Sequence, residues 1–172
     1  MKRIVTALVT NQPGVLNRIT GLFSRRGFNI ESIAVGHSEL EGLSRMTFVV
    51  NMAEDTKIEQ IVKQLNKQID VLKVIDVTDK EIVSRELALI RVAATGTTRQ
   101  EISGFIDPFR ASIVDVSRDS LMIEVTGEST KIDALIELLQ PYGIKDISRT
   151  GTIAIPRGLQ KEKYQSKTIL YV

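Results

Sequence analysis

The chain has 172 residues and a formal net charge of +2; 42% of its residues are hydrophobic and 26% are charged. These values are typical of a soluble globular protein with one ordinary domain or two small ones. Basic residues are scattered along the chain, which argues against a nucleic-acid-binding patch. The sequence has no cysteine, which excludes disulfides, thiolate catalysis and cysteine-based metal sites. No apolar run approaches the ~20 residues that span a membrane, so we expect a cytoplasmic protein.

The N-terminal region predicts a strand over residues 2–10, a break over 11–14, and then an amphipathic helix. Pro13 suits the first helical turn, and Arg25 in the last turn favours the helix dipole. Gly27 is a natural residue to end the helix. The apolar stripe of this helix has the spacing i, i+1, i+4, i+7 and i+8 and consists of Val15, Leu16, Ile19, Leu22 and Phe23.

Two more strands are predicted over residues 29–38 and 44–52, joined by a turn that contains Gly42. The only histidine, His37, is expected at an exposed strand end. A second helix and a fourth strand over residues 71–78 complete the order βαββαβ. One face of the 44–52 strand is apolar through Met46, Phe48 and Val50, and the second helix carries the stripe Ile58, Ile61, Val62, Leu65 and Ile69.

The same order then repeats after a charged linker over residues 79–86. A strand over 87–94 precedes a helix in which Thr98 and Glu101 have capping-box spacing. A hairpin of strands 111–117 and 121–126 and a helix capped by Ser129 follow. A last strand over 144–155 is interrupted near Gly151. The predicted domains are therefore 1–78 and 87–156, separated by the linker 79–86 and followed by a tail, 157–172.

The predicted fold class is α+β, with two tandem ferredoxin-like βαββαβ domains, each a four-stranded antiparallel sheet with two helices on one face. Many functions share this fold. A metallochaperone would need a paired-cysteine loop, and an RNA-recognition domain would need aromatic residues on its central strands. An acylphosphatase-like enzyme would need an arginine in residues 10–14, and the sequence has none there.

The break at residues 11–14 contains Asn11, Pro13 and Gly14 at the start of a helix. Free backbone amides at a helix start, together with the helix dipole, can bind an anion. Asn11 offers both a donor and an acceptor that could orient a zwitterion, as could Asn29 at the start of the next strand. An Asn-x-Pro-Gly sequence also makes an ordinary strand-to-helix turn, and Asn29 could equally be a turn residue.

Three segments resemble the small regulatory subunit of acetohydroxyacid synthase (acetolactate synthase). They are residues 11–16 (NQPGVL), 22–32 (LFSRRGFNIES) and 44–47 (SRMT). The resemblance covers nearly the whole chain, and residues 25–32 are its most specific part. The Asn-x-x-Gly-Val-Leu pattern alone recurs through the broader ACT-domain group.

This resemblance implies that residues 1–78 form an ACT domain, which pairs with the same domain of a second subunit in a homodimer or higher oligomer. Valine or another branched-chain amino acid would bind at that interface. The partner would be the catalytic subunit, which would hold thiamine diphosphate, magnesium and FAD, whereas this chain would hold no cofactor and no metal. This chain would raise the activity of that subunit and confer feedback inhibition. The implied ligand site combines Asn11, Pro13, Gly14, Val15 and Leu16 of one subunit with Asn29 and Ile30 of the other.

Two other classes of function remain open on the sequence. The chain could be a stand-alone tandem ACT-type sensor that controls a different enzyme or a transcription factor. It could also be an enzyme, for which the acid–base candidates are Glu31, Glu39, Asp70 and Asp76. None of these forms a recognisable catalytic pair. The second domain has residues 95–98 (TGTT) where the first has its polar loop, and we interpret this segment as a helix cap.

Overall fold

A computed structural model describes residues 2–51 and 56–158. The described residues divide into two compact units, one formed by residues 2–51, 56–83 and 154–158 and the other by residues 84–153. The predicted tail, 157–172, lies outside the described residues except for Arg157 and Gly158. In the part of the chain that the structure describes, no helix is long and apolar enough to cross a membrane.

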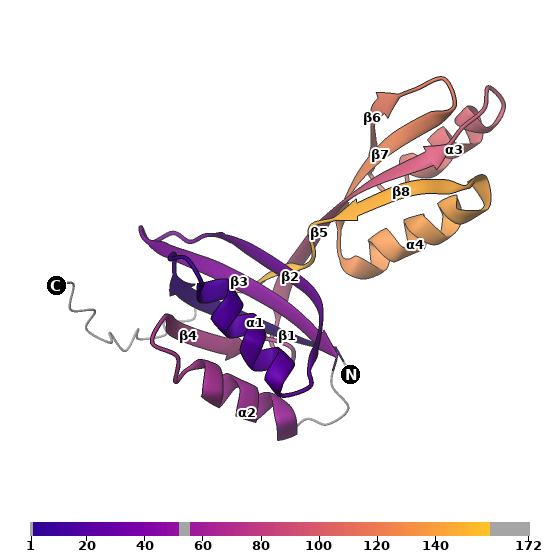
Figure 1. Cartoon of the computed structure of the whole chain (residues 1–172). Helices are drawn as coiled ribbons and strands as arrows, with labels where there is room; N and C mark the ends of the chain where they lie inside the picture. The colour runs from indigo at the N-terminus through magenta and orange to yellow at the C-terminus, as the bar shows by residue number, and fades with distance from the viewer. Residues whose placement is uncertain (1, 52–55, 159–172) are drawn as a thin grey trace. The chain divides into compact units, whose positions relative to one another are not determined.

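The first unit is a four-stranded sheet in the order β2-β3-β1-β4, with helices α1 and α2 packed on one face (Figure 1). Both β2 and β4 are therefore edge strands. All three strand pairs are antiparallel, as predicted. The elements are β1 (Lys2–Thr10), α1 (Val15–Arg25), β2 (Asn29–His37), β3 (Leu43–Asn51), α2 (Thr56–Leu65) and β4 (Val71–Asp76).

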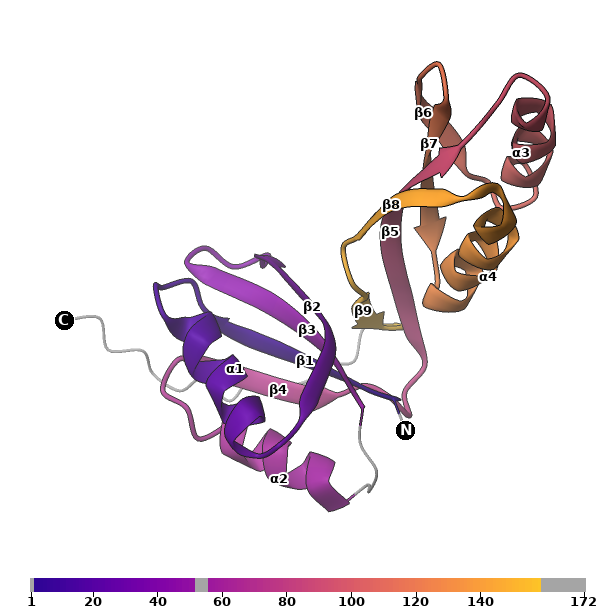
Figure 2. The ribbon, with the colours of Figure 1, turned by 45° about the vertical axis from the view of Figure 1, so that its right-hand side comes forward.

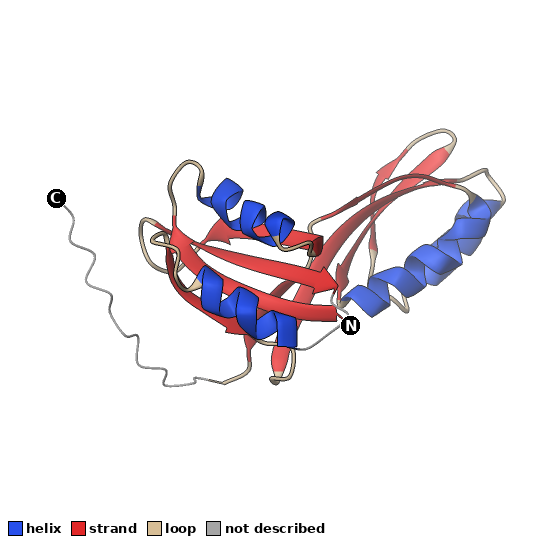
Figure 3. Cartoon of the chain, turned by 60° about the horizontal axis from the view of Figure 1, so that its bottom comes forward, coloured by secondary structure: helices blue, strands red, loops and turns tan. Residues whose placement is uncertain are grey.

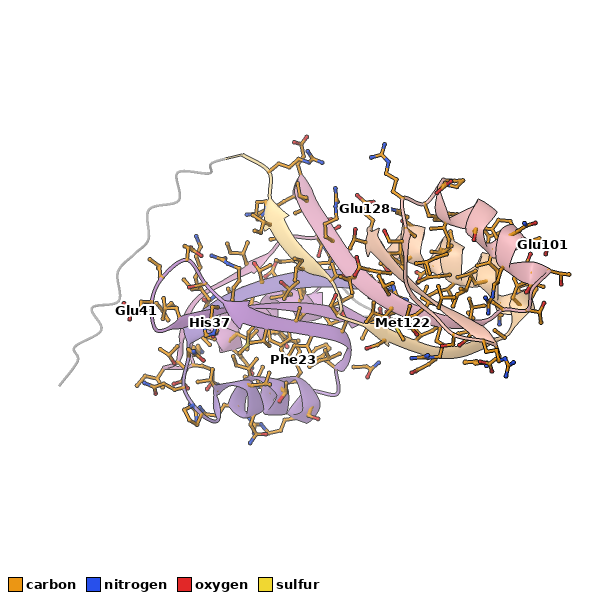
Figure 4. All side chains as sticks on the ribbon, turned by 90° about the horizontal axis from the view of Figure 1, so that it is seen from above. Phe23, His37, Glu41, Glu101, Met122 and Glu128 are labelled. Carbon is orange, nitrogen blue, oxygen red and sulfur yellow. The ribbon has the colours of Figure 1, made fainter. Side chains whose placement is uncertain are left out.

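The core of the first unit lies between the sheet and its helices. Phe23 of α1 and Phe48 of β3 are fully buried there, with ring centroids 5.1 Å apart; Figure 4 labels Phe23. The predicted apolar face of the third strand is confirmed, because Met46, Phe48 and Val50 all belong to this core. Ile69 is an exception to the predicted helical stripe: it is 94% exposed, since α2 ends at Leu65 and Ile69 lies in the following turn.

The chain leaves the C-terminal end of α1 at Gly27, as the sequence predicts. Gly27 has φ +70, a left-handed conformation that glycine adopts without strain. Its amide donates to the carbonyl of Ser24, and the amide of Phe28 donates to the carbonyl of Phe23. These two bonds form a Schellman motif, which satisfies the last carbonyls of the helix and turns the chain into β2.

The second unit repeats the arrangement, with the order β6-β7-β5-β8 and with β9 paired to β5 off this path. Its helices α3 and α4 lie on one side of the sheet (Figures 2 and 3). The tandem ferredoxin-like fold predicted from the sequence is thus confirmed. The elements are β5 (Ile82–Ala93), α3 (Thr98–Ile106), β6 (Ser112–Val116), β7 (Ser120–Gly127), α4 (Ser129–Leu139), a 3-10 turn (Gln140–Tyr142) and β8 (Ile144–Arg149). Strand β9 (Ile153–Pro156) follows, and from Ala154 onward its residues belong to the first unit.

Two details of the second unit differ from the expectation. Strand β5 begins at Ile82, within the predicted linker and before the expected residue 87. The adjacent charged residues Arg85 and Glu86 concealed it, because a glutamate is rarely buried unless it is paired, and Glu86 is 6% exposed. The last strand is interrupted as predicted, since Gly151 has φ +78 and separates β8 from β9.

The predicted side-chain caps of α3 and α4 are not formed. Thr98 and Ser129 are the first residues of their helices, and neither helix has a side-chain cap hydrogen bond. The Thr98 hydroxyl instead accepts the amide of Thr95 at 2.8 Å, and the Ser129 hydroxyl donates to Asp133 at 3.4 Å. The capping-box spacing of Thr98 with Glu101 and the predicted cap at Ser129 therefore placed both helix starts within one residue but assigned the hydroxyls the wrong partners.

Candidate functional site

The polar loop of residues 11–14 lies at one end of the first unit's sheet, where three turns meet. The amide of Asn11 donates to the carbonyl of Gly42 in the β2–β3 hairpin at 2.8 Å. The amide of Thr10 donates to the carbonyl of Asp70, just before β4, at 2.9 Å. Both neighbouring turns thus hold the chain as it leaves β1, so that the loop starts from a fixed position.

Gly14 is the residue at which the loop becomes the helix α1. Its φ of +83 and ψ of −10 place it in the left-handed region, and it has no side chain to cap the helix. The first backbone amides of a helix have no partner within the helix. Since α1 has no side-chain cap and no acidic residue in its first turn, its start can accept a negatively charged group of a ligand.

The predicted ligand residues in this loop and in the first turn of α1 differ in how far they are exposed to solvent. Asn11, Pro13 and Gly14 are exposed, and the side chain of Leu16 is 44% exposed on the first turn of α1. Val15 is 2% exposed and belongs to the core, so only its backbone faces the start of the helix. The loop thus offers backbone amides, an amide side chain and one apolar side chain.

Asn29 and Ile30, the other predicted ligand residues, lie at the opposite end of the same sheet. Lys2 of β1 and Asn29 of β2 both pair with Asn51, whereas Asn11 follows the other end of β1. The length of β1 separates these ends by about 27 Å at ~3.3 Å per residue. Within one chain, the two halves of the predicted site are therefore far apart.

A β-bulge interrupts the pairing of β2 with β3 directly after Ile30, so that Ser32 is the next paired residue. Glu31 lies in the bulge and forms an ion pair with Lys2 at 3.2 Å. Asn29 is exposed, and Ile30 is partly buried against the core. At the far end of β2, His37 is exposed, as predicted, and Figure 4 shows Glu41 on the hairpin beyond it.

The carboxylates considered as acid–base candidates are all engaged by basic side chains. The backbone of Glu39 and the Arg45 side chain hold the pKa of Glu39 below its usual value of 4.5. Among the described residues, no group of three His, Cys, Asp or Glu side chains could hold a metal ion. The ion pairs are Lys2–Glu31 (3.2 Å), Arg45–Glu39 (3.0 Å), Arg18–Asp70 (2.7 Å) and Arg3–Asp76 (3.8 Å).

Sequence reasoning missed Arg18 as a neighbour of the loop. Arg18 lies one turn into α1, and a Cβ atom built on Gly14 would lie 3.0 Å from its Nη1. Its Nε donates to Asp70 at 2.7 Å. The i+4 spacing from Gly14 places Arg18 on the same helix face, but no sequence pattern connects it with Asp70.

Two family models match the chain, one on each unit. An acetohydroxyacid synthase small subunit-like ACT domain matches residues 5–73. A domain described as the small subunit of acetolactate synthase matches residues 85–158. The first match spans β1 to β4 and includes every predicted ligand residue.

Similar proteins match over nearly the full length. The acetolactate synthase small subunit of Bacillus subtilis is 63% identical over 172 residues, which are 100% of both chains. A probable acetolactate synthase small subunit of Archaeoglobus fulgidus is 53% identical over 94% of this chain and 100% of its own. The crystal structure of the acetolactate synthase small subunit from Thermotoga maritima superposes with a TM-score of 0.84 at 43% identity, covering 92% of this chain and 99% of that one.

Proposed function

Because the chain belongs to the family of acetolactate synthase small subunits, we propose that it regulates a thiamine-diphosphate-dependent catalytic subunit. In this proposal it raises the activity of that subunit and makes it sensitive to feedback by valine. The observation that carries the proposal is the 63% identity over the whole of both chains with a protein named as this subunit. The chemistry would belong to the partner, because the candidate acids of this chain are engaged in ion pairs.

The proposed effector site is shared between two copies of the chain. If the edge strand β2 pairs antiparallel with β2 of a second copy, the first residue of one strand lies beside the end of the other. Asn29 begins β2, and His37 ends it next to the hairpin whose Gly42 carbonyl accepts the Asn11 amide. This pairing would bring Asn29 of one chain to the loop of the other, which a single chain cannot do.

The exposed groups of the two half-sites suit a branched-chain amino acid. The open start of α1 would accept the carboxylate, and the Asn11 and Asn29 amides would bind the ammonium and carboxylate. Leu16 and Ile30 would contact the aliphatic side chain. Val15 would contribute its backbone, since its side chain is buried.

A shared site gives the effector a way to regulate. Valine would stabilise the arrangement of the two chains that it binds better, and only by the difference between its affinities for the two arrangements. The catalytic subunit would respond to that arrangement. The second unit would contribute subunit contacts and relay the signal, because its equivalent loop has Ala94 in place of Asn11.

Thermal unfolding with L-valine tests the sensor function, with D-valine and L-lysine as controls. A ligand specific to the native protein should stabilise it by about 2.7 kcal/mol at a hundredfold excess over Kd. Asn11→Ala and Asn29→Ala should each abolish this shift and the valine inhibition of the reconstituted holoenzyme. Full valine sensitivity in both variants would contradict the site assignment.

Affinity capture from the source cell tests the partner. The regulatory proposal expects the thiamine-diphosphate-dependent synthase to be recovered with the tagged full-length chain, and expects purified small subunit to raise the activity of purified catalytic subunit. A chain that binds valine but neither captures nor activates that synthase would instead be a stand-alone sensor.

A further inference from the structure

One carboxylate holds both sides of the loop at residues 11–14. Asp70 Oδ1 accepts a hydrogen bond from the Thr10 hydroxyl at 3.4 Å, at the end of β1. Asp70 Oδ2 accepts a hydrogen bond from Arg18 Nε at 2.7 Å, one turn into α1. The backbone carbonyl of Asp70 also accepts the Thr10 amide at 2.9 Å. The end of the strand and the start of the helix are thus fixed to the same residue.

The guanidinium of Arg18 also occupies the space beside Gly14. A Cβ atom at position 14 would lie 3.0 Å from Arg18 Nη1, closer than an ordinary van der Waals contact. Gly14 itself is in the left-handed conformation, which a larger residue adopts only with strain. Arg18 therefore covers the turn from which α1 begins.

The Arg18–Asp70 pair is better shielded from solvent than an ordinary surface pair. The side chain of Asp70 is 12% exposed and that of Arg18 is 48% exposed. In the pair between Lys63 and Glu59 on α2, both side chains are 73% exposed. Ion pairs that are open to water contribute little, whereas a partly buried, hydrogen-bonded carboxylate restrains the groups around it.

We propose that Arg18, held by Asp70, is a positioning residue that sets the geometry of the effector loop. This inference rests on the proposed function, because it concerns the same site. Arg18 need not touch the ligand: its pairing with Asp70 fixes the left-handed turn at Gly14 and the direction of the first amides of α1. A binding site holds its ligand tightly only when such supporting contacts restrain its groups.

The test compares Arg18→Gln, Asp70→Asn and the double variant of the full-length chain, by calorimetric titration with L-valine. Each single change should weaken valine binding about tenfold, as losing one hydrogen bond to a charged group does. The double variant should be no weaker than either single variant, because the two residues act as a unit. Arg18→Lys should recover part of the affinity, since an ammonium can still pair with Asp70.

Hydrogen exchange without ligand gives a second, independent measurement. The amides of Thr10 and Asn11, which donate to the carbonyls of Asp70 and Gly42, should exchange faster in Arg18→Gln than in the wild type. Lys63→Gln, which breaks the exposed pair on α2, is the matched control and should change neither the exchange of these amides nor the affinity for valine.

The outcomes separate this inference from the proposed function. Wild-type valine affinity in both Arg18→Gln and Asp70→Asn, with loss in Asn11→Ala, would overturn the positioning role and leave the effector site intact. No valine binding by the wild type, with faster exchange in Arg18→Gln, would overturn the effector site and support the positioning role. Neither binding nor a change in exchange would overturn both.

Discussion

The two units build the same loop scaffold with different side chains. In the first unit, the amides of Thr10 and Asn11 donate to the carbonyls of Asp70 and Gly42. In the second, the amides of Ala93 and Ala94 donate to the carbonyls of Gly143 and Asp119, in the same places of the fold. The backbone anchors of the loop therefore belong to the βαββαβ fold rather than to a ligand site.

The chemistry of the two loops differs at each equivalent position. The second unit has a buried alanine, Ala94, where the first has Asn11. Thr97 has φ −82 where Gly14 has φ +83, so the two helices start from opposite backbone conformations. Residues 95–98 were predicted to cap the helix, but their hydroxyls bond one another and the Thr95 amide instead, and α3 has no side-chain cap hydrogen bond.

The pair between helix and turn differs as well. The first unit has Arg18 and Asp70, whereas the second has Glu101 and Tyr142, whose hydroxyl donates to the carboxylate at 3.3 Å. Desolvation by burial and the neighbouring carboxylate raise the pKa of Tyr142. The same backbone scaffold thus carries an asparagine and a left-handed glycine in one unit and threonines in the other, so any difference in binding between the two loops would come from these few residues.

The largest expected effect is the loss of stability caused by a substitution in the core of the first unit. Phe23→Ala should destabilise the first unit by about 3–5 kcal/mol, since Phe23 is fully buried against Phe48. The free energy of opening that hydrogen exchange reports for the first unit's amides should fall by this amount. The second unit has its own core, so its amides should keep their protection. Leu40→Ala, at a side chain that is 45% exposed, is the control and should change little. Equal loss of protection in both units would show that they unfold together.

Glycine substitutions test the difference between the loops. Gly14→Ala should weaken L-valine binding by at least about tenfold and destabilise the chain by about 1 kcal/mol, because φ is positive and the new Cβ meets Arg18. Gly96→Ala is the matched change in the second unit, where φ is not positive and a Cβ meets nothing within 4 Å. Calorimetric titration and urea unfolding of both variants measure these effects. Equal valine affinity in the two variants would contradict the proposal that valine binds at the loop of the first unit and not at that of the second.

The fold and the effector loop could be predicted to different extents. Apolar periodicity was enough for α1, for the core face of β3 and for the repeated order of elements, because each spacing reports one buried face. The start of β5 was missed because it contains the adjacent charged residues Arg85 and Glu86, and nothing in the local pattern indicates that Glu86 is buried beside Arg149. The proposed pairing of Asn11 with Asn29 requires strand register and a second chain, and the Arg18–Asp70 pair joins residues that are distant in sequence, so neither follows from local pattern.

An ion pair of the second unit should affect stability without affecting the effector. Glu86, whose side chain is 5% exposed, accepts two hydrogen bonds from Arg149 at 2.7 and 2.9 Å. Glu86→Gln should destabilise the second unit by about 1–2 kcal/mol, less than for a fully buried pair because Arg149 is 30% exposed. Urea unfolding should detect this loss, with Glu137→Gln at an exposed position of α4 as the control. A tenfold change in valine affinity in Glu86→Gln would contradict the separate roles of the two units.

The smallest expected effect is a pH dependence of stability at the β2–β3 hairpin, where Glu39 pairs with Arg45. The backbone and Arg45 lower the pKa of Glu39 below 4.5, so this carboxylate stabilises the fold above its unfolded pKa and loses that effect as the pH falls through the folded value. Glu39→Gln should therefore cost less than about 1 kcal/mol at pH 7, because the pair is exposed, and less at pH 3 than at pH 7. Urea unfolding at both pH values measures the difference. A cost that grows toward pH 3 would have the wrong sign.

The central claim, that the effector site needs Asn11 of one chain and Asn29 of another, is tested most directly by mixing variants. Neither the Asn11→Ala dimer nor the Asn29→Ala dimer should bind L-valine. In a dimer of one Asn11→Ala and one Asn29→Ala chain, one of the two sites is intact, so an equal mixture allowed to exchange subunits should recover about a quarter of the wild-type sites. Calorimetric titration of the mixture gives that number. No recovery after verified subunit exchange would contradict a site shared between chains.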